Sequence, residues 1–102
     1  MANTADESQV KAQGKKAKLV RDQEVKDMLW VLDSPQGRRF VWRYLGITGV
    51  FRSSFTGSPE TTHFNEGGRN IGLRLLEDIN EAKPEAYLQM TKEAQLSEVN
   101  DA

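Results

Sequence analysis

The stretch FRSSFTGSPETTHFNEGGRNIGLRLL, residues 51–76, decides how this chain is built. It begins as a polar loop and continues as a helical pattern that has three glycines in its first half. Each glycine costs the interior of a helix about 0.8–1 kcal/mol relative to alanine. A helix tolerates this cost where another backbone approaches it closely, so the spacing of the three glycines is informative.

Gly68 and Gly72 lie one helical turn apart and therefore share one face of the predicted helix, which makes them candidate close-packing positions. Small residues at this spacing allow a second backbone, from this chain or a neighbouring copy, to pack against the helix. A local kink, or a helix that starts late near Asn70, is the alternative. Gly67 is expected to be packed less closely.

The loop before the glycines is the nearest candidate for the group that covers them. We expect it to fold back over the glycine face, with Arg52 or Arg69 holding the two together by hydrogen bonds. Phe51 and Phe55 either plug this loop onto the core or project from it to anchor a partner, since exposed aromatic side chains often dominate interfaces.

Outward from this stretch, apolar residues at helical spacing predict a first helix over residues 22–34, a second over 34–46, a third over 58–82 and a fourth over 83–96. Ser34 and Ser58 are predicted N-caps, each followed by a proline at the first helical position. Gly46 is predicted to end the second helix. The predicted inward positions are Val25, Met28, Leu29, Leu32, Phe40, Val41, Tyr44, Leu45, Phe64, Ile71, Leu75, Leu76, Ile79, Tyr87, Met90 and Leu96.

These patterns predict an all-α fold. We expect a small bundle of three to four helices, a long Gly/Ser-containing loop between the second and third, and flexible charged termini. Residues 1–20 are expected to form a basic tail, disordered or ordered by a partner, residues 21–97 the helical domain, and residues 98–102 an acidic tail. Trp30 and Val31 widen the first apolar stripe beyond what one small core needs.

Charge is distributed unevenly along the chain. Residues 1–50 carry nine Lys/Arg and six Asp/Glu, whereas residues 51–102 carry five and nine, and the net charge is −1. Such a chain can pair end to end with copies of itself or lay its basic half on an anion. Cysteine is absent and no run approaches 18 apolar residues, so we expect neither disulfides nor a membrane-spanning segment.

Six arginines gather in the middle of the chain: Arg38, Arg39, Arg43, Arg52, Arg69 and Arg74. Arg39 and Arg43 share a helical face and could bind phosphates or carboxylates through bidentate contacts. Internal pairing with Asp27, Asp33, Glu66 or Glu77 is the equal alternative. The candidate protein-interface residues are therefore Trp30, Arg38, Arg39, Arg43, Phe51, Arg52, Phe55 and Arg69.

Catalytic and metal-binding patterns are missing from the sequence. His63 is the single histidine, and a hydrolytic metal site usually needs at least three ligands. Ser53, Ser54 and Thr56 have no base that would activate a hydroxyl. No phosphate-binding loop or dinucleotide fingerprint occurs. We therefore expect no catalytic residues, no metal, no cofactor and no enzymatic activity.

The segment from Gly37 to Ile79 resembles a family of small proteins of short-tailed bacteriophages whose type member comes from a Bordetella phage. The similarity lies in GRR followed by a tryptophan, then GVFRSSFTG, then ETTHFNEGGRNIGLRLL, and it covers residues of about 27–90. The shared motif positions are Phe51, Arg52, Ser53, Ser54, Phe55, Gly57, Gly67, Gly68, Arg69, Asn70 and Gly72. The resemblance implies a phage protein, typically encoded among virion and packaging genes, with no assigned catalytic residues.

Together these features predict a non-enzymatic virion structural protein, present in several copies near the portal, neck or internal core. Its expected partners are copies of itself and other phage virion proteins. Its expected locations are the virion and, during assembly, the host cytoplasm. The alternative is a DNA-binding accessory protein of genome packaging or ejection that contacts DNA phosphates through the Arg/Lys-rich N-terminal half.

Overall fold

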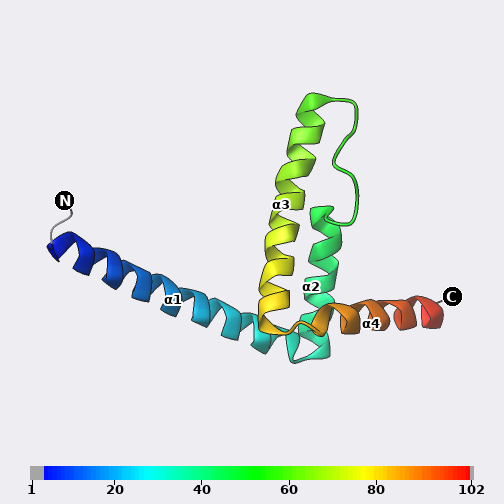
Figure 1. Cartoon of the computed structure of the whole chain (residues 1–102). Coiled ribbons are helices and arrows are strands. Elements are labelled where there is room, and N and C mark those ends of the chain that lie inside the picture. Colours follow the sequence, from blue (N-terminus) through cyan, green and yellow to red (C-terminus); the bar gives the residue numbers. More distant parts are fainter. Residues whose placement is uncertain (1–3, 102) are drawn as a thin grey trace.

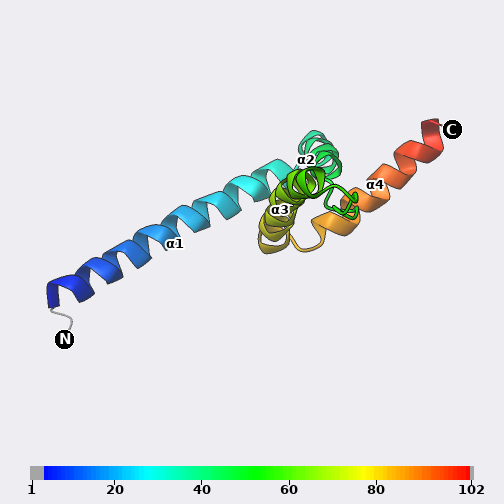
Figure 2. The same cartoon turned by 90° about the horizontal axis from the view of Figure 1, so that it is seen from above.

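The computed structural model describes the backbone over residues 4–101 and the side chains over residues 6–98. This part of the chain contains four helices and no strand: α1 (Thr4–Leu32), α2 (Pro35–Thr48), α3 (Pro59–Ala82) and α4 (Ala86–Asp101). The predicted all-α fold is confirmed. Helices α2 and α3 stand side by side and antiparallel, whereas α1 and α4 run outward from their base in opposite directions (Figures 1 and 2).

The boundaries of α2 follow from its capping residues. The Ser34 hydroxyl accepts a hydrogen bond from the backbone N–H of Gly37 (3.0 Å), and Pro35 occupies the first turn, as predicted. The predicted stop at Gly46 is wrong, because α2 continues to Thr48 and Gly49 takes the left-handed conformation (φ 75°). A left-handed residue commonly ends a helix, and here Gly49 has that conformation whereas Gly46 keeps helical geometry.

Helix α3 spans the predicted range, but it begins differently. Ser58 is in the N-cap position and its side chain makes no capping hydrogen bond. Instead, the hydroxyls of Thr56 and Thr62 lie 3.2 Å apart, and Thr62 accepts a hydrogen bond from the backbone N–H of Thr56 (3.1 Å). These contacts hold the end of the long loop against the first turn of α3.

Helix α1 begins at Thr4 and crosses the boundary predicted at residue 20 without a break. Nine of residues 4–20 are Ala, Lys or Gln, which have high helix propensity, and Gly14 is the weakest helix former in this segment. Residues 6–20 are all exposed. A basic helical arm therefore projects from the body, and its ordering by a partner stays a prediction.

The core runs from the base of the α2–α3 pair, where α1 and α4 join it, up to the far end of α2. Its buried apolar residues are Leu32, Val41, Leu45, Val50, Ile79, Ala86 and Met90. Four predicted core residues are exposed instead: Phe40 (53%), Tyr44 (44%), Phe64 (81%) and Ile71 (66%). Leu29 and Leu96 are exposed as well. The apolar pattern of α2 and α3 is wider than the single face that this small core can cover.

The chain is extended rather than compact. Its radius of gyration is 18.7 Å, and its extents are 66 × 39 × 16 Å. A compact chain of this length would have a radius of gyration of about 13 Å. The chain exposes 7990 Å², whereas a compact protein of 11.5 kDa exposes about 5,800 Å². Much apolar surface is therefore left without an internal partner.

Candidate functional site

The glycine face of α3 packs against the end of α2 and the start of the long loop. A Cβ added at Gly72 would collide with the Thr48 hydroxyl and would lie 2.7 Å from the Cβ of Val50. A Cβ added at Gly68 would lie 3.1 Å from the carbonyl oxygen of Thr48, and one at Gly67 would meet nothing within 4 Å. The backbone of this corner can approach α3 only because Gly68 and Gly72 have no side chains.

The loop is joined to α3 by residues other than the predicted arginines. The Asn65 side-chain amide donates a hydrogen bond to the Ser54 carbonyl (3.4 Å), and Thr62 accepts one from Thr56. Among the described residues, Arg52 and Arg69 make no hydrogen bond to the opposite segment, so the predicted arginine tie is wrong.

Arg52 and Arg69 instead line a shallow polar pocket of about 340 Å³ together with Val50, Phe51, Ser53 and Ser54. None of the described carboxylates lines it. Phe51 also packs with Trp42 and Tyr87, at ring-centroid distances of 5.8 and 6.2 Å. Phe55 is 77% exposed. The two loop phenylalanines thus have different environments, Phe51 on an aromatic cluster and Phe55 in solvent.

The three arginines of α2 also have different environments. Arg38 is buried: its Nε donates to the Glu93 carboxylate (2.7 Å) and its Nη1 to the Leu32 carbonyl (2.9 Å). It therefore joins the end of α1 and the middle of α4 to α2. Glu93 is not among the internal partners that the sequence suggested, and it lies 55 residues after Arg38 in the chain.

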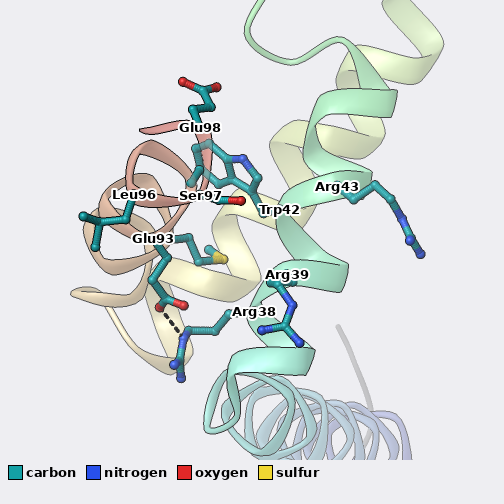
Figure 3. A pocket seen from close by; sticks show the side chains of 10 residues that line it. Arg38, Arg39, Trp42, Arg43, Glu93, Leu96, Ser97 and Glu98 are labelled. Atoms are coloured by element: carbon teal, nitrogen blue, oxygen red, sulfur yellow. Dashed lines mark hydrogen bonds and ion pairs between the residues drawn. The ribbon is translucent and has the colours of Figure 1, made fainter. Parts of the chain in front are cut away.

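Arg39 and Arg43 are exposed on α2. The Arg43 guanidinium lies over the rings of Phe40 and Tyr44, 5.5 Å from each centroid, and points away from α4 (Figure 3). This cation–π contact occupies one flat face of the group and leaves its N–H donors free to turn outward.

A groove of about 710 Å³ separates α2 from α4 (Figure 3). Its lining residues are Arg38, Arg39, Trp42, Arg43, Met90, Glu93, Ala94, Leu96, Ser97 and Glu98. The Arg38–Glu93 ion pair closes one end of the groove, and Trp42 and Leu96 provide apolar surface (Figure 3). Its volume lies within the range of small-molecule pockets, but six of its ten lining residues are charged or polar, whereas such pockets are lined mainly by apolar side chains.

Arg21 joins α1 to α3 through polar contacts, and sequence reasoning missed them because the predicted first helix begins only at residue 22. Its guanidinium donates to Asp78 (2.7 Å) and to Glu81 of α3. These hydrogen bonds, with Glu81 the larger cause, raise the pKa of Arg21 above its usual value. The signal was present, because Arg21 continues the stripe of Val25, Met28 and Leu32 by one more turn.

Several large apolar side chains are exposed on the helices. Trp30 is 80% exposed on α1, and Ile47, Phe64 and Ile71 are more than 60% exposed on α2 and α3. His63 is exposed on α3. Among the described residues, no three His, Asp or Glu side chains gather in a way that could hold a metal ion. Within the same residues, none of the helices combines the length and the apolar character needed to cross a membrane.

Comparison with known proteins gives one match. A family model described as Bbp19-like phage protein matches residues 28–92, which include the base of the fold, the glycine face and the loop. Neither the search of curated proteins nor the search of solved structures found a match. The model covers more than half of the chain and nearly the same residues as the predicted phage resemblance. The chain therefore belongs to the family of Bbp19-like phage proteins.

Proposed function

We propose that this phage protein is a non-enzymatic structural component of the virion, present in several copies and acting through protein–protein contacts. The observation that carries the proposal is the exposed apolar surface of an extended chain, which exposes about 2,200 Å² more than a compact protein of its mass. Monomeric soluble proteins rarely leave large apolar patches uncovered, because burying them against a partner is favourable.

Its proposed place is near the portal, neck or internal core of the particle, after assembly in the host cytoplasm. The family supports a phage protein, and the narrower location is our inference from the residues that are available for contact. Mass spectrometry and cryo-electron microscopy of purified particles test it. We expect several copies per virion, and particles from which the protein is absent would rule out a virion role.

The purified chain is expected to self-associate. Trp30, Phe64 and Ile71 are exposed to solvent in the single chain, so association would remove large apolar areas from water. Sedimentation at concentrations of tens of micromolar should reveal oligomers that dissociate on dilution. A stable monomer with one cooperative unfolding transition would contradict this expectation.

A second candidate function is DNA binding during packaging or ejection, and the exposed basic arm of α1 favours it. Lys11, Lys15, Lys16 and Lys18 all lie on this arm, and all are exposed. Such a cluster can neutralise DNA phosphates and would give binding that weakens steeply with salt, with a slope of about −0.9 per phosphate contact.

The double variant Arg39→Ala/Arg43→Ala separates the two functions. We expect it to weaken self-association and to leave duplex DNA affinity unchanged, because Arg43 already stacks on Phe40 and Tyr44 beside the exposed apolar surface. Sedimentation and DNA titrations over a range of salt concentrations measure the two effects. Tight DNA binding by the natural chain would favour the packaging function instead, and its loss in this variant would place the phosphate contacts on α2 rather than on the arm.

A further inference from the structure

One side of the α2–α3 pair is covered by α1 at its base only. On α3, Asp78 receives the hydrogen bond from Arg21 of α1. On α2, Gly37 packs so closely against the Val31 carbonyl of α1 that an added Cβ would collide with it. Figure 1 shows α1 meeting the pair at its lower end. These contacts fix which side of each helix faces α1.

Beyond the contact with α1, the same side of the α2–α3 pair is exposed toward the loop end. Residues seven apart on a helix differ by about 20° in direction, so they lie on nearly the same side. Ile71 precedes Asp78 by seven residues, and Phe64 precedes Ile71 by seven. Tyr44 follows Gly37 by seven, and Ile47, one turn farther along α2, lines a pocket together with Phe64 of α3. We call these four residues, Tyr44, Ile47, Phe64 and Ile71, the open face; their exposed fractions run from 44% to 81%.

Helix α1 also has an outer side without a partner. Met28 and Leu32 face the base, and Leu32 is fully buried. Trp30 follows Met28 by two residues, about 200° around the helix, so it points away from the base. It is 80% exposed, and Leu19, three turns earlier on the same side, is 69% exposed.

We propose that a second copy of this chain covers the open face, and that the outer side of its α1 helix, with Trp30 as the anchor, lies on Tyr44, Ile47, Phe64 and Ile71. This inference rests on the proposed function, since it names the partner and the surface in the multi-copy assembly. The side of the α2–α3 pair that contacts the chain's own α1 at the base would contact the partner's α1 nearer the loop end.

The arrangement is self-complementary. In a two-fold symmetric dimer whose α2–α3 pairs point in opposite directions, the α1 helix of each copy lies over the open face of its partner. The two α1 helices then form a middle layer between two α2–α3 pairs. From Asp78 to the midpoint of Phe64 and Ile71 is about 15 Å along α3, which leaves room for a second helix about 10 Å in diameter.

The available area is sufficient for such a dimer. Standard interfaces bury about 800 Å² per partner, and obligate homodimers bury about 1,000–2,500 Å² per partner. The whole chain exposes about 2,200 Å² more than a compact protein of its mass, and the open face and the outer side of α1 are part of that excess. The pairing also places tryptophan, the residue type most enriched at binding hot spots, at the centre of the contact.

Sedimentation of Trp30→Ser tests the anchor. We expect a dimer for the natural sequence and a dissociation constant at least about 30-fold higher for the variant. Circular dichroism should be unchanged, because Trp30 makes little contact within its own chain. Leu88→Ser on α4 is the matched control: Leu88 is 57% exposed but lies outside the proposed contact, so this variant should dimerise normally.

Crosslinking tests the geometry, and the natural chain contains no cysteine that would interfere. Lys26→Cys chains mixed with Ile71→Cys chains should give a heterodimer with a short bismaleimide. Leu88→Cys chains mixed with Ile71→Cys chains should not. A natural chain that stays monomeric, or a dimer that is insensitive to Trp30→Ser and crosslinks equally in both mixtures, overturns this inference. The presence of the protein in purified virions, which tests the proposed function, is independent of either result.

Discussion

Gly72→Leu is expected to destabilise the chain by at least about 3 kcal/mol and to remove cooperative unfolding. Even one added carbon would collide with Thr48 and lie 2.7 Å from the Cβ of Val50. The Thr48 hydroxyl cannot turn away freely, because it donates a hydrogen bond to the Leu45 carbonyl (2.7 Å). Overpacking commonly costs 1–3 kcal/mol, and four extra heavy atoms at a backbone contact exceed that case. Thermal and urea unfolding followed by circular dichroism measure the loss.

The other two glycines of this helix provide graded controls. Gly67→Ala adds a methyl group that meets nothing within 4 Å, so it should be neutral or stabilise the helix by up to about 1 kcal/mol. At Gly68 the new carbon would lie 3.1 Å from the Thr48 carbonyl oxygen, so Gly68→Ala should fall between the other two variants. Equal stability of all three variants would show that the packing of Thr48 and Val50 on α3 does not require Gly68 and Gly72.

The helices that have capping residues or prolines at their ends were predictable from the sequence. Helix α3 follows from Pro59 and from an apolar pattern that ends before Pro84, and α2 begins where Ser34 and Pro35 place it. These signals act within a few residues of the element that they start or stop, so no knowledge of tertiary packing is needed. The end of α2 was less certain because two glycines, Gly46 and Gly49, both fit a helix stop.

The buried face of α2 was not predictable in the same way. Phe40, Val41, Trp42, Tyr44 and Leu45 surround most of the helix with apolar surface, so periodicity does not select one side. The structure buries Val41 and Leu45 and packs Trp42 against the core, whereas Phe40 and Tyr44 face solvent. The choice depends on where α1 and α4 cross, and those crossings are set by residues that are distant in sequence.

The polar contacts of the candidate site depend on the same long-range geometry. Arg21 meets Asp78 and Glu81, and Arg38 meets Glu93, over separations of more than 50 residues. A sequence shows which charged residues are present but not which of them the fold brings together. The six arginines in the middle of the chain therefore look alike in the sequence, although the structure pairs Arg38 with Glu93 and stacks Arg43 on two aromatic rings.

Arg38→Ala is expected to cost about 2–3 kcal/mol of folding free energy. The change removes the donor to the Leu32 carbonyl and leaves the Glu93 carboxylate without its partner at a helix junction. Breaking a fully buried pair costs about 3–5 kcal/mol, and the exposed third of Glu93 lowers this value because water can solvate the carboxylate there. Urea unfolding measured at low protein concentration separates this effect from any change in association.

Arg39→Ala is the matched control for this prediction. Arg39 is the next residue on the same helix and is exposed, so its removal should change stability by less than about 0.5 kcal/mol. Glu93→Gln identifies the cause of the Arg38 effect, because the neutral amide removes the charge without emptying the site. If Arg38 acts through Glu93, Arg38→Ala should cost less in a Glu93→Gln background than in the natural chain. Equal costs in both backgrounds would instead assign the effect to the Leu32 carbonyl and the packing of the arginine stem, with α4 held to α2 by apolar contacts alone.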